Sequence, residues 1–365
     1  MLRVALRHAF PGFTLDVDFA APPGVTVLFG RSGSGKTTIV DAVAGLLTPD
    51  AGRIEVSGRV LLDTGDGVFL PPHRRRLGYI FQEGRLFPHL TVRQNLAYGA
   101  WFAPRGAARE DRGRVVEMLG LGALLDRRPG ALSGGEKQRV AIGRALLAAP
   151  RLILADEPLA ALDEARKAEI LPYFERLRDE VSVPILYVSH AASEVARLAT
   201  TVVALADGRV ARQGAAADVL GDPAVTPTGV REAGAILTGR VAAQHADGLT
   251  EIALPEGRLL LPRIPAETGR EVRVRIEAQD VILALDVPSR ISALNVLRAT
   301  VTELRPGVGP GMLVQLRAGG EVLLARVTRR SAEALGLAPG VACYAVVKSV
   351  AVAQADVGTG PAADM

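Results

Sequence analysis

The sequence predicts two domains of different class: an α/β domain built on a parallel sheet, followed by a small all-β domain. Over the first part of the 365 residues, continuous apolar runs typical of buried strands alternate with helical segments. From the segment TPTG at residues 226–229 onward, short strands and Gly/Pro turns dominate. We therefore place the boundary near residue 230, which gives domains of residues 1–230 and 231–365.

The elements of the first domain follow from its apolar runs and turn residues. Strands are expected within residues 2–29 and at 53–63, 75–82, 151–156 and 183–189. Helices are expected at 36–47, 92–100, 107–119, 136–148 and 164–180, with one more after residue 190. An Asp-Gly turn at residues 207–208 predicts a hairpin over 202–214.

The second domain contains two similar passes of strand, hairpin and closing strand pair. The first pass runs from GRVAAQ to VILAL and the second from LRATVTEL to VAVA, with one brief helix near residues 331–335. Two such units would complete a small OB-like β-barrel that neither would close alone. The alternative is that any all-β domain alternates in this way.

Composition excludes several classes of protein. The formal net charge is only +4, so we expect no nucleic-acid partner, and we interpret the basic run HRRR at 73–76 as a solvated turn. The single cysteine, Cys343, excludes a disulfide within the chain and is expected to be buried as a small apolar side chain. The N-terminus has no signal-peptide pattern and no window approaches a membrane span, so we expect a cytosolic protein.

The segment GRSGSGKT at residues 30–37 matches the P-loop (Walker A) pattern. It follows a buried strand and precedes a helix, which predicts an α/β P-loop NTPase. Backbone N–H groups of such a loop surround phosphate oxygens, Lys36 reaches the β- and γ-phosphates, and the Thr37 hydroxyl binds Mg²⁺. The residues expected to bind nucleotide here are Gly30, Arg31, Ser32, Gly33, Ser34, Gly35, Lys36, Thr37 and Thr38.

Three further polar positions follow predicted strands. LILADE ends in Asp156, expected to hold Mg²⁺ or its water, and in Glu157, expected to act as the base toward the attacking water. His190 ends another apolar strand and is expected to contact the γ-phosphate or to position Glu157. Gln82 lies at the end of a short strand, where its amide oxygen can ligate Mg²⁺ or bind the attacking water.

A second phosphate-binding arrangement lies in LSGGEKQR at residues 132–139. Ser133, Gly134 and Gly135 precede or begin a helix, whose N-terminus offers free N–H groups to an anion.

The P-loop, Gln82, LSGGEKQR, LILADEP, ALD at 161–163 and His190 occur in this order and spacing, and together they resemble the ATPase subunit of ABC transporters. The resemblance covers residues 1 to about 220. It implies a helical subdomain at about 83–150 and a head-to-tail dimer, in which the signature LSGGEKQR of one copy holds the γ-phosphate of ATP bound to the other. It also implies that Asp163 lies at the dimer seam and that Phe10 or Phe13 stacks on adenine.

Two segments narrow the resemblance to importers of the molybdate type (ModC-like). The run RRLGYIFQEGRLFPHLTVRQNLAYG is similar to the ATPase of molybdate importers, and residues 290–354 resemble the Mop, or TOBE, domain of molybdate-handling proteins. In that family such domains bind a tetrahedral oxyanion, and the matching residues here are Ser292, Ala293, Asn295, Lys348 and Ser349. Leu294 stands where the family often has Arg, so a barrel that serves only in dimer contacts remains the alternative.

The resemblance implies an ATP- and Mg²⁺-dependent subunit on the cytoplasmic face of the inner membrane that powers uptake of molybdate or tungstate. Its expected partners are a second copy, integral membrane permease subunits and, indirectly, an external molybdate-binding protein. The alternatives are an importer ATPase for sulfate or ferric iron, or a soluble ABC ATPase outside transport.

Overall fold

The structure is a computed structural model that describes residues 1–102, 110–160, 162–222, 233–307 and 309–360. The chain forms two compact units, Met1–His190 with Leu198–Gly214, and Ala191–Arg197 with Ala215–Met365. The boundary that we expected near residue 230 lies outside the described residues. Each unit is described by itself.

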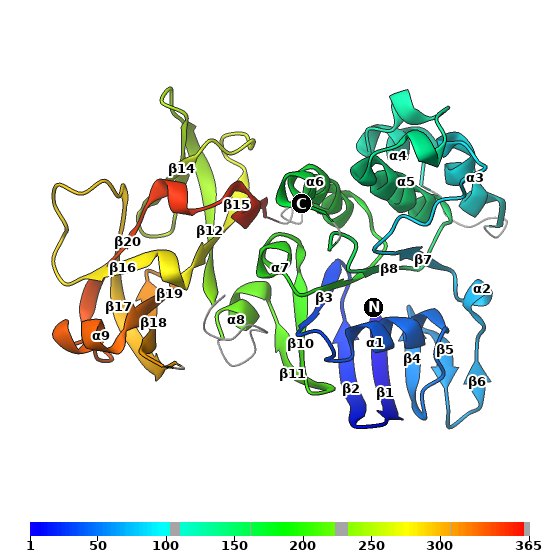
Figure 1. The fold of residues 1–365 in the computed structure, drawn as a ribbon, viewed down its shortest axis with the longest axis horizontal. Coiled ribbons are helices and arrows are strands. Elements are labelled where there is room, and N and C mark those ends of the chain that lie inside the picture. The colour runs from blue at the N-terminus through cyan, green and yellow to red at the C-terminus, as the bar shows by residue number, and fades with distance from the viewer. Residues whose placement is uncertain (103–109, 161, 223–232, 308, 361–365) are drawn as a thin grey trace. The chain divides into compact units, whose positions relative to one another are not determined.

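The first unit contains two sheets and a group of helices (Figure 1). Its strands are β1 (Leu2–Phe10), β2 (Phe13–Ala21), β3 (Val25–Gly30), β4 (Ala51–Val56), β5 (Arg59–Asp63), β6 (Val68–Phe69), β7 (Leu77–Ile80), β8 (Leu152–Asp156), β9 (Ile185–Ser189), β10 (Thr201–Ala206) and β11 (Arg209–Gly214). Its helices are α1 (Lys36–Ala44), α2 (Pro72–Arg75), α3 (Val92–Phe102), α4 (Arg112–Met118), α5 (Gly134–Leu147) and α6 (Glu164–Glu180). Helix α7 (Ala192–Leu198) follows β9.

The central sheet of the first unit is parallel, as predicted, apart from its last strand. Its order is β11-β10-β3-β9-β8-β7, and only β11 runs antiparallel to its neighbour. A second, antiparallel sheet has the order β2-β1-β4-β5-β6. Helix α1 packs between them, since Ile39, Val40 and Val43 share one apolar core with residues of both sheets.

Most predicted elements are present, with differences at their ends. Helix α6 spans residues 164–180 as expected. Helix α1 ends at Ala44 rather than residue 47, because Gly45 adopts a left-handed conformation (φ 81°) that terminates the helix. The strand expected at 75–82 is limited to β7, and the first residues of the helix expected at 107–119 lie outside the described residues.

The interpretation of HRRR as a solvated turn is wrong for Arg75, which is only 1% exposed. Its guanidinium donates to the backbone oxygens of Leu70 (2.6 Å), Ala42 (2.7 Å) and Val43 (2.9 Å). Two of these carbonyls belong to the last turn of α1, where a cation is favoured by the helix dipole. Burial lowers the pKa of Arg75 to about 10. The Arg75 side chain therefore connects the C-terminal end of the P-loop helix to the segment between β6 and α2.

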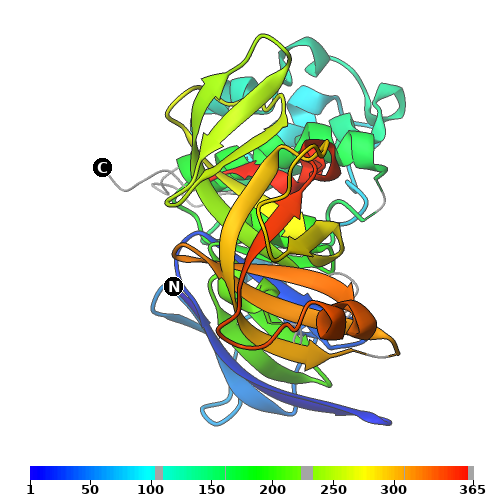
Figure 2. The same ribbon diagram turned by 90° about the vertical axis from the view of Figure 1, so that its left-hand side faces the viewer.

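The second unit is built from two five-stranded sheets (Figure 2). Its strands are β12 (Gly234–Gln244), β13 (Leu249–Ala253), β14 (Arg258–Pro262), β15 (Glu271–Glu277), β16 (Val281–Ala284), β17 (Asn295–Pro306), β18 (Gly311–Ala318), β19 (Glu321–Thr328), β20 (Ala342–Val347) and β21 (Val357–Thr359). It also has the helices α8 (Ala216–Leu220) and α9 (Arg329–Ala334). The brief helix expected at 331–335 thus begins two residues earlier, where Thr328 caps it.

The two sheets have the same topology, which bears out the predicted internal repeat. Their orders are β14-β13-β12-β15-β21 and β19-β18-β17-β20-β16. In each pass the first four strands form one sheet and the fifth strand joins the sheet of the other pass. Both sheets contribute to one apolar core, in which Cys343 is 1% exposed as predicted. The exchange of closing strands makes the two passes depend on each other.

Candidate functional site

The P-loop connects β3 to α1, and its glycines permit backbone geometry that other residues disfavour. Gly33 and Gly35 have φ values of 82° and 99°. A Cβ atom on Gly35 would lie 2.7 Å from Leu15 Cδ1, so a larger residue would also displace the loop from β2. No side chain caps the start of α1, which leaves its first N–H groups available to an anion.

The Lys36 side chain is buried and extends back along this loop. Its Nζ donates to the backbone oxygens of Gly30 and Arg31, each at 2.8 Å. Burial lowers the pKa of Lys36, while the carboxylates of Glu157 and Asp156 act in the opposite direction. The ammonium is therefore held at the loop by carbonyl groups and faces two carboxylates.

An open cavity of about 830 Å³ lies over the P-loop. It brings together residues of the loop, of the segment after β7 and of the end of β8. They are Phe10, Phe13, Ser32, Gly33, Gly35, Lys36, Thr37, Thr38, Phe81, Gln82, Glu83, Arg85, Asp156 and Glu157. The size suits a nucleotide-sized ligand, and the lining supplies both phosphate-binding groups and aromatic rings.

Asp156 provides the atoms that a cation would need. Its Oδ1 atom is buried without a hydrogen-bond partner among the described residues, while Oδ2 accepts a long hydrogen bond of 3.5 Å from the Tyr79 hydroxyl. Burial raises the pKa of Asp156, and the nearby charges of Glu157 and Asp41 raise it further. A Mg²⁺ ion would satisfy the orphaned oxygen and lower this pKa, so the residues present fit the expected metal.

Glu157 is placed at the same end of the sheet in an unusual backbone conformation. Its φ of 43° lies in the left-handed region, which non-glycine residues rarely adopt. One carboxylate oxygen lies 3.4 Å from Nδ1 of His190, which follows β9. The parallel sheet thus brings together two residues that are 33 positions apart in the sequence.

Gln82 also lines the cavity. Three neighbouring residues that the sequence analysis did not predict line it as well. Phe81, Glu83 and Arg85 follow β7, and the Arg85 guanidinium lies 4.3 Å from the centre of the Phe81 ring. Tyr79 was missed as well, because the pairing that places it opposite Leu154 of β8 and brings its hydroxyl to Asp156 has no local sequence signal.

Both aromatic candidates for adenine stacking line the cavity. The ring centres of Phe10 and Phe13 are 6.2 Å apart. Phe13 packs close to Gly35 of the P-loop, while Phe10 is 36% exposed.

The signature residues lie away from this cavity. Ser133 caps helix α5 and forms a capping box with Glu136, since each side chain accepts a hydrogen bond from the other's backbone N–H (3.2 and 2.7 Å). Ser133 and Gly134 are exposed, and none of residues 133–135 lines the cavity. Asp163 is exposed as well and caps α6 by accepting from the N–H of Arg166 at 2.9 Å.

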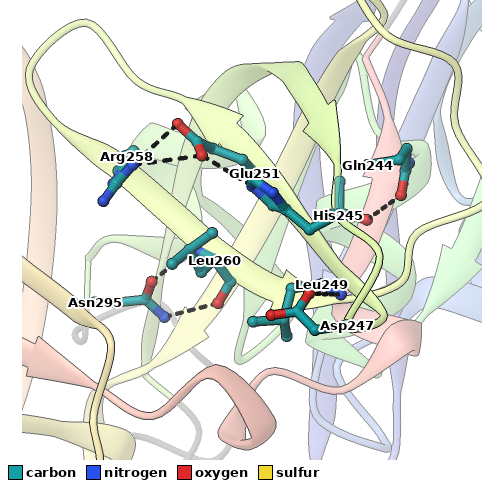
Figure 3. A network of polar contacts seen from close by, with 9 residues as sticks. Gln244, His245, Asp247, Leu249, Glu251, Arg258, Leu260 and Asn295 are labelled. Atoms are coloured by element: carbon teal, nitrogen blue, oxygen red, sulfur yellow. Dashed lines mark hydrogen bonds and ion pairs between the residues drawn. The ribbon is translucent and has the colours of Figure 1, made fainter.

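The expected oxyanion residues lie at the start of β17 and directly after β20. Ser292 and Lys348 are exposed, whereas Asn295 and Ser349 are buried. Figure 3 shows the Asn295 amide paired with both backbone groups of Leu260, which donates to Oδ1 at 2.6 Å and accepts from Nδ2 at 3.1 Å. Nδ2 also lies 3.5 Å from Ser349 Oγ. The Asn295 amide therefore covers the outer edge of β14.

Comparison with known families agrees with this division of the chain. Residues 15–160 match the ABC transporter family, and residues 291–354 match the TOBE domain. Within the described part of the chain, every helix is too short or too polar to cross a membrane.

Curated relatives match over nearly the whole chain. The molybdenum import ATP-binding protein ModC of Mesorhizobium japonicum is 50% identical over 98% of this chain and 98% of its own. The protein of the same name from Rhizobium meliloti is 53% identical over 96% of this chain and 99% of its own. Among solved structures, cbiO1 of Clostridium perfringens, part of the ABC transporter complex cbiONQ, is similar with a TM-score of 0.52 and 27% identity, over 60% of this chain and 90% of that one.

The matching families, the near-complete coverage of these relatives and the P-loop cavity agree, and the chain belongs to the family of ABC transporter ATP-binding proteins, among those of the molybdenum import type.

Proposed function

We propose that this chain hydrolyses ATP to drive molybdate uptake through membrane permease subunits, on the cytoplasmic face of the membrane, with an external binding protein supplying the ion. The names of its relatives support this substrate, and the P-loop cavity supports the reaction. The working form is a head-to-tail pair of chains.

The observation that carries the pairing is the separation of two phosphate-binding arrangements within one chain. The cavity contains Lys36, Thr37, Asp156 and Glu157, while the N-terminus of α5 with Ser133 is exposed and lies outside it. The signature of a second chain would complete the phosphate site, because backbone N–H groups and a hydroxyl stabilise the charge that develops on a transferred phosphoryl group.

The roles within the site follow from its geometry. Lys36 and the N–H groups of residues 30–38 bind the phosphates, and Phe10, as the more exposed ring, stacks on adenine. Asp156, Thr37 and Gln82 would hold Mg²⁺, which would supply positive charge to offset part of the negative charge of the phosphates. Glu157 orients and deprotonates the attacking water, and His190 at 3.4 Å holds that carboxylate in place.

Substitution of Glu157 by Gln tests this assignment. The amide keeps the size of the side chain but cannot accept a proton, so we expect the hydrolysis rate to fall by about 100-fold or more while ATP is still bound. Because ATP then remains between the chains, size-exclusion chromatography of Glu157→Gln with ATP and Mg²⁺ should show a stable dimer. Wild-type hydrolysis rates in the variant, or no dimer under these conditions, would contradict the proposal.

The second unit is proposed to sense the oxyanion or to contact the second chain. Ser292, Ala293, Lys348 and Ser349 offer hydroxyl groups, backbone N–H groups and one exposed cation beside Asn295. Because the Asn295 amide is bonded to Leu260, its contribution is to hold the start of β17 at the edge of β14.

A further inference from the structure

The two oxygen atoms of the Asp156 carboxylate have different surroundings. Oδ1 is buried and has no hydrogen-bond partner among the described residues, whereas Oδ2 accepts a hydrogen bond of 3.5 Å from the hydroxyl of Tyr79. Within the described part of the chain, this hydroxyl is the only group that donates a hydrogen bond to the Asp156 side chain. One oxygen is therefore held by the protein, and the other is left for a ligand.

The central sheet brings Tyr79 and Asp156 together although they are 77 positions apart in the sequence. Tyr79 lies on β7, in register with Leu154 of the parallel strand β8, and Asp156 is the last residue of β8. Side chains two positions apart on a strand point to the same face of a sheet, so those of Leu154 and Asp156 share a face. Tyr79 and Leu154 both belong to the apolar core that includes residues of α1. The Tyr79 side chain thus extends along this face to the carboxyl end of β8.

Packing restricts the position of the Tyr79 ring. It packs against the apolar core of the first unit and stacks on the Phe81 ring, with 4.1 Å between the ring centres and 16° between the planes. The Phe81 ring is in turn contacted by the Arg85 guanidinium, 4.3 Å from its centre. Phe81 and Arg85 line the nucleotide cavity, whereas Tyr79 does not. The hydroxyl is therefore carried by a ring that has little freedom to move and that lies behind the wall of the cavity.

A hydrogen bond to the second oxygen matters because a carboxylate can rotate about its Cβ–Cγ bond. It holds a metal-ligating carboxylate in one orientation, and loss of such an outer partner typically reduces metal affinity by about 10- to 100-fold. The bond from Tyr79 to Asp156 is long, but hydrogen bonds in active sites often shorten when substrate binds. We therefore expect an effect at the lower end of this range.

We infer that Tyr79 is a positioning residue for magnesium binding: its hydroxyl holds Oδ2 of Asp156, so that Oδ1 stays available to the Mg²⁺ ion or to a water molecule on it. Tyr79 acts through Asp156 and not by direct contact with the nucleotide, since it does not line the cavity. The inference rests on the proposed hydrolysis of ATP with Mg²⁺.

The test measures how much Mg²⁺ strengthens nucleotide binding to the full-length chain. Adenylyl imidodiphosphate, a non-hydrolysable ATP analogue, is titrated calorimetrically in excess Mg²⁺ and in EDTA. The Kd in EDTA divided by the Kd in Mg²⁺ gives the contribution of the metal. Tyr79→Phe removes the hydroxyl but keeps the ring and its stacking on Phe81. We expect the ratio to fall by about 10-fold, with the Kd in EDTA within about 2-fold of wild type.

Two further variants make the result specific. Tyr173→Phe is the matched control, because it removes a hydroxyl that accepts a hydrogen bond from Arg139 (3.2 Å) and does not belong to the cavity. It should leave both Kd values unchanged. Asp156→Asn removes the charge of the metal ligand and measures the whole contribution of Asp156. If Tyr79 acts through Asp156, Tyr79→Phe lowers the ratio no further than Asp156→Asn does.

A ratio for Tyr79→Phe equal to that for Tyr173→Phe would overturn the inference. An equal loss of affinity in Mg²⁺ and in EDTA would also overturn it, because it would show a general effect on the cavity. The same holds for a wild-type ratio of one, since no metal contribution would then remain for Tyr79 to support. Failure of the wild-type chain to bind the analogue at all would instead contradict the proposed function, so the two failures are distinguishable.

Discussion

The P-loop cavity is lined by one cation, Lys36, and by two carboxylates, Asp156 and Glu157. Their charges are not fully compensated by the protein. The Lys36 ammonium is satisfied by two loop carbonyls, while one Asp156 oxygen is buried without a partner in the described structure. Burial lowers the pKa of Lys36 and raises that of Asp156, so each group is disfavoured in its charged form. Phosphate oxygens and a divalent cation would compensate both, which is why these residues fit ATP and Mg²⁺ together.

At the same scale, sequence patterns predicted the residues that end strands but not those placed by tertiary packing. Asp156 and Glu157 were predictable because parallel strands present their carboxyl ends at one edge. Arg75 was not, because its burial depends on the last turn of α1, more than 30 residues earlier in the chain. Asn295 was predicted from a resemblance, but its pairing with Leu260 across the sheet edge has no local signal.

Lys348 offers a residue-scale test of the second unit. In calorimetric titration of the full-length chain we expect saturable heat with molybdate and none with sulfate. Lys348→Met removes the exposed cation of the proposed site and should weaken molybdate binding by about 10-fold or more, as expected for loss of a charge-assisted hydrogen bond.

The control for this titration is Arg298→Met, which removes one exposed positive charge from strand β17 but none of the proposed oxyanion residues. Equal losses in both variants would indicate a general charge effect. No saturable heat in the wild-type chain would leave the unit with a structural role in pairing.

At the scale of elements, helix α5 takes part in two predicted phosphate-binding regions. The signature LSGGEKQR lies at its N-terminal end, and its side chains bond the backbone on either side of Gln82. The sequence predicted its start at residue 136, and the structure places it at Gly134 because Ser133 is the N-cap. The capping box was missed as a start signal, although Ser133 and Glu136 have the spacing that defines it.

The capping box makes the stability of this helix depend on pH. The hydrogen bond from the Ser133 N–H lowers the pKa of Glu136 below its ordinary 4.5. A lowered carboxyl pKa contributes stability above the unfolded-state value and loses it as pH falls through the folded-state value. Glu136→Ala should therefore reduce the free energy of unfolding by about 1 kcal/mol at pH 7, and this difference should shrink below about pH 4.5.

Urea unfolding of both proteins between about pH 2.5 and pH 7, with closely spaced points below about pH 5, measures this dependence. Glu136→Gln serves as the control, because its amide oxygen still accepts the hydrogen bond but does not titrate in this range. A Glu136→Ala effect that is constant over these pH values would show that the carboxylate charge does not contribute to the cap.

At the scale of the whole molecule, each unit closes its core through long-range strand pairing. The repeat in the second unit was visible as two similar sequence passes, and the equal strand orders of the two sheets agree with it. The exchange of β16 and β21 between the sheets was not predictable, since these strands pair with partners from the other pass. Local patterns predict strands well, but they do not specify the partner of each strand.

The two units also divide the proposed functions between them. The first contains the P-loop cavity and the signature helix, and the second contains the proposed oxyanion residues. Hydrolysis can therefore be tested with purified chain, whereas the identity of the imported ion depends on the permease and requires a cellular measurement.

Uptake of radioactive molybdate into cells measures the proposed transport function itself. Cells that lack this chain but retain its permease are supplied either with the wild-type chain or with Glu157→Gln, and uptake of sulfate is followed in parallel. We expect that the wild-type chain restores molybdate uptake, that Glu157→Gln does not, and that sulfate uptake is the same in both. Molybdate uptake that does not depend on the chain, or a loss of sulfate uptake instead, would contradict the proposed function.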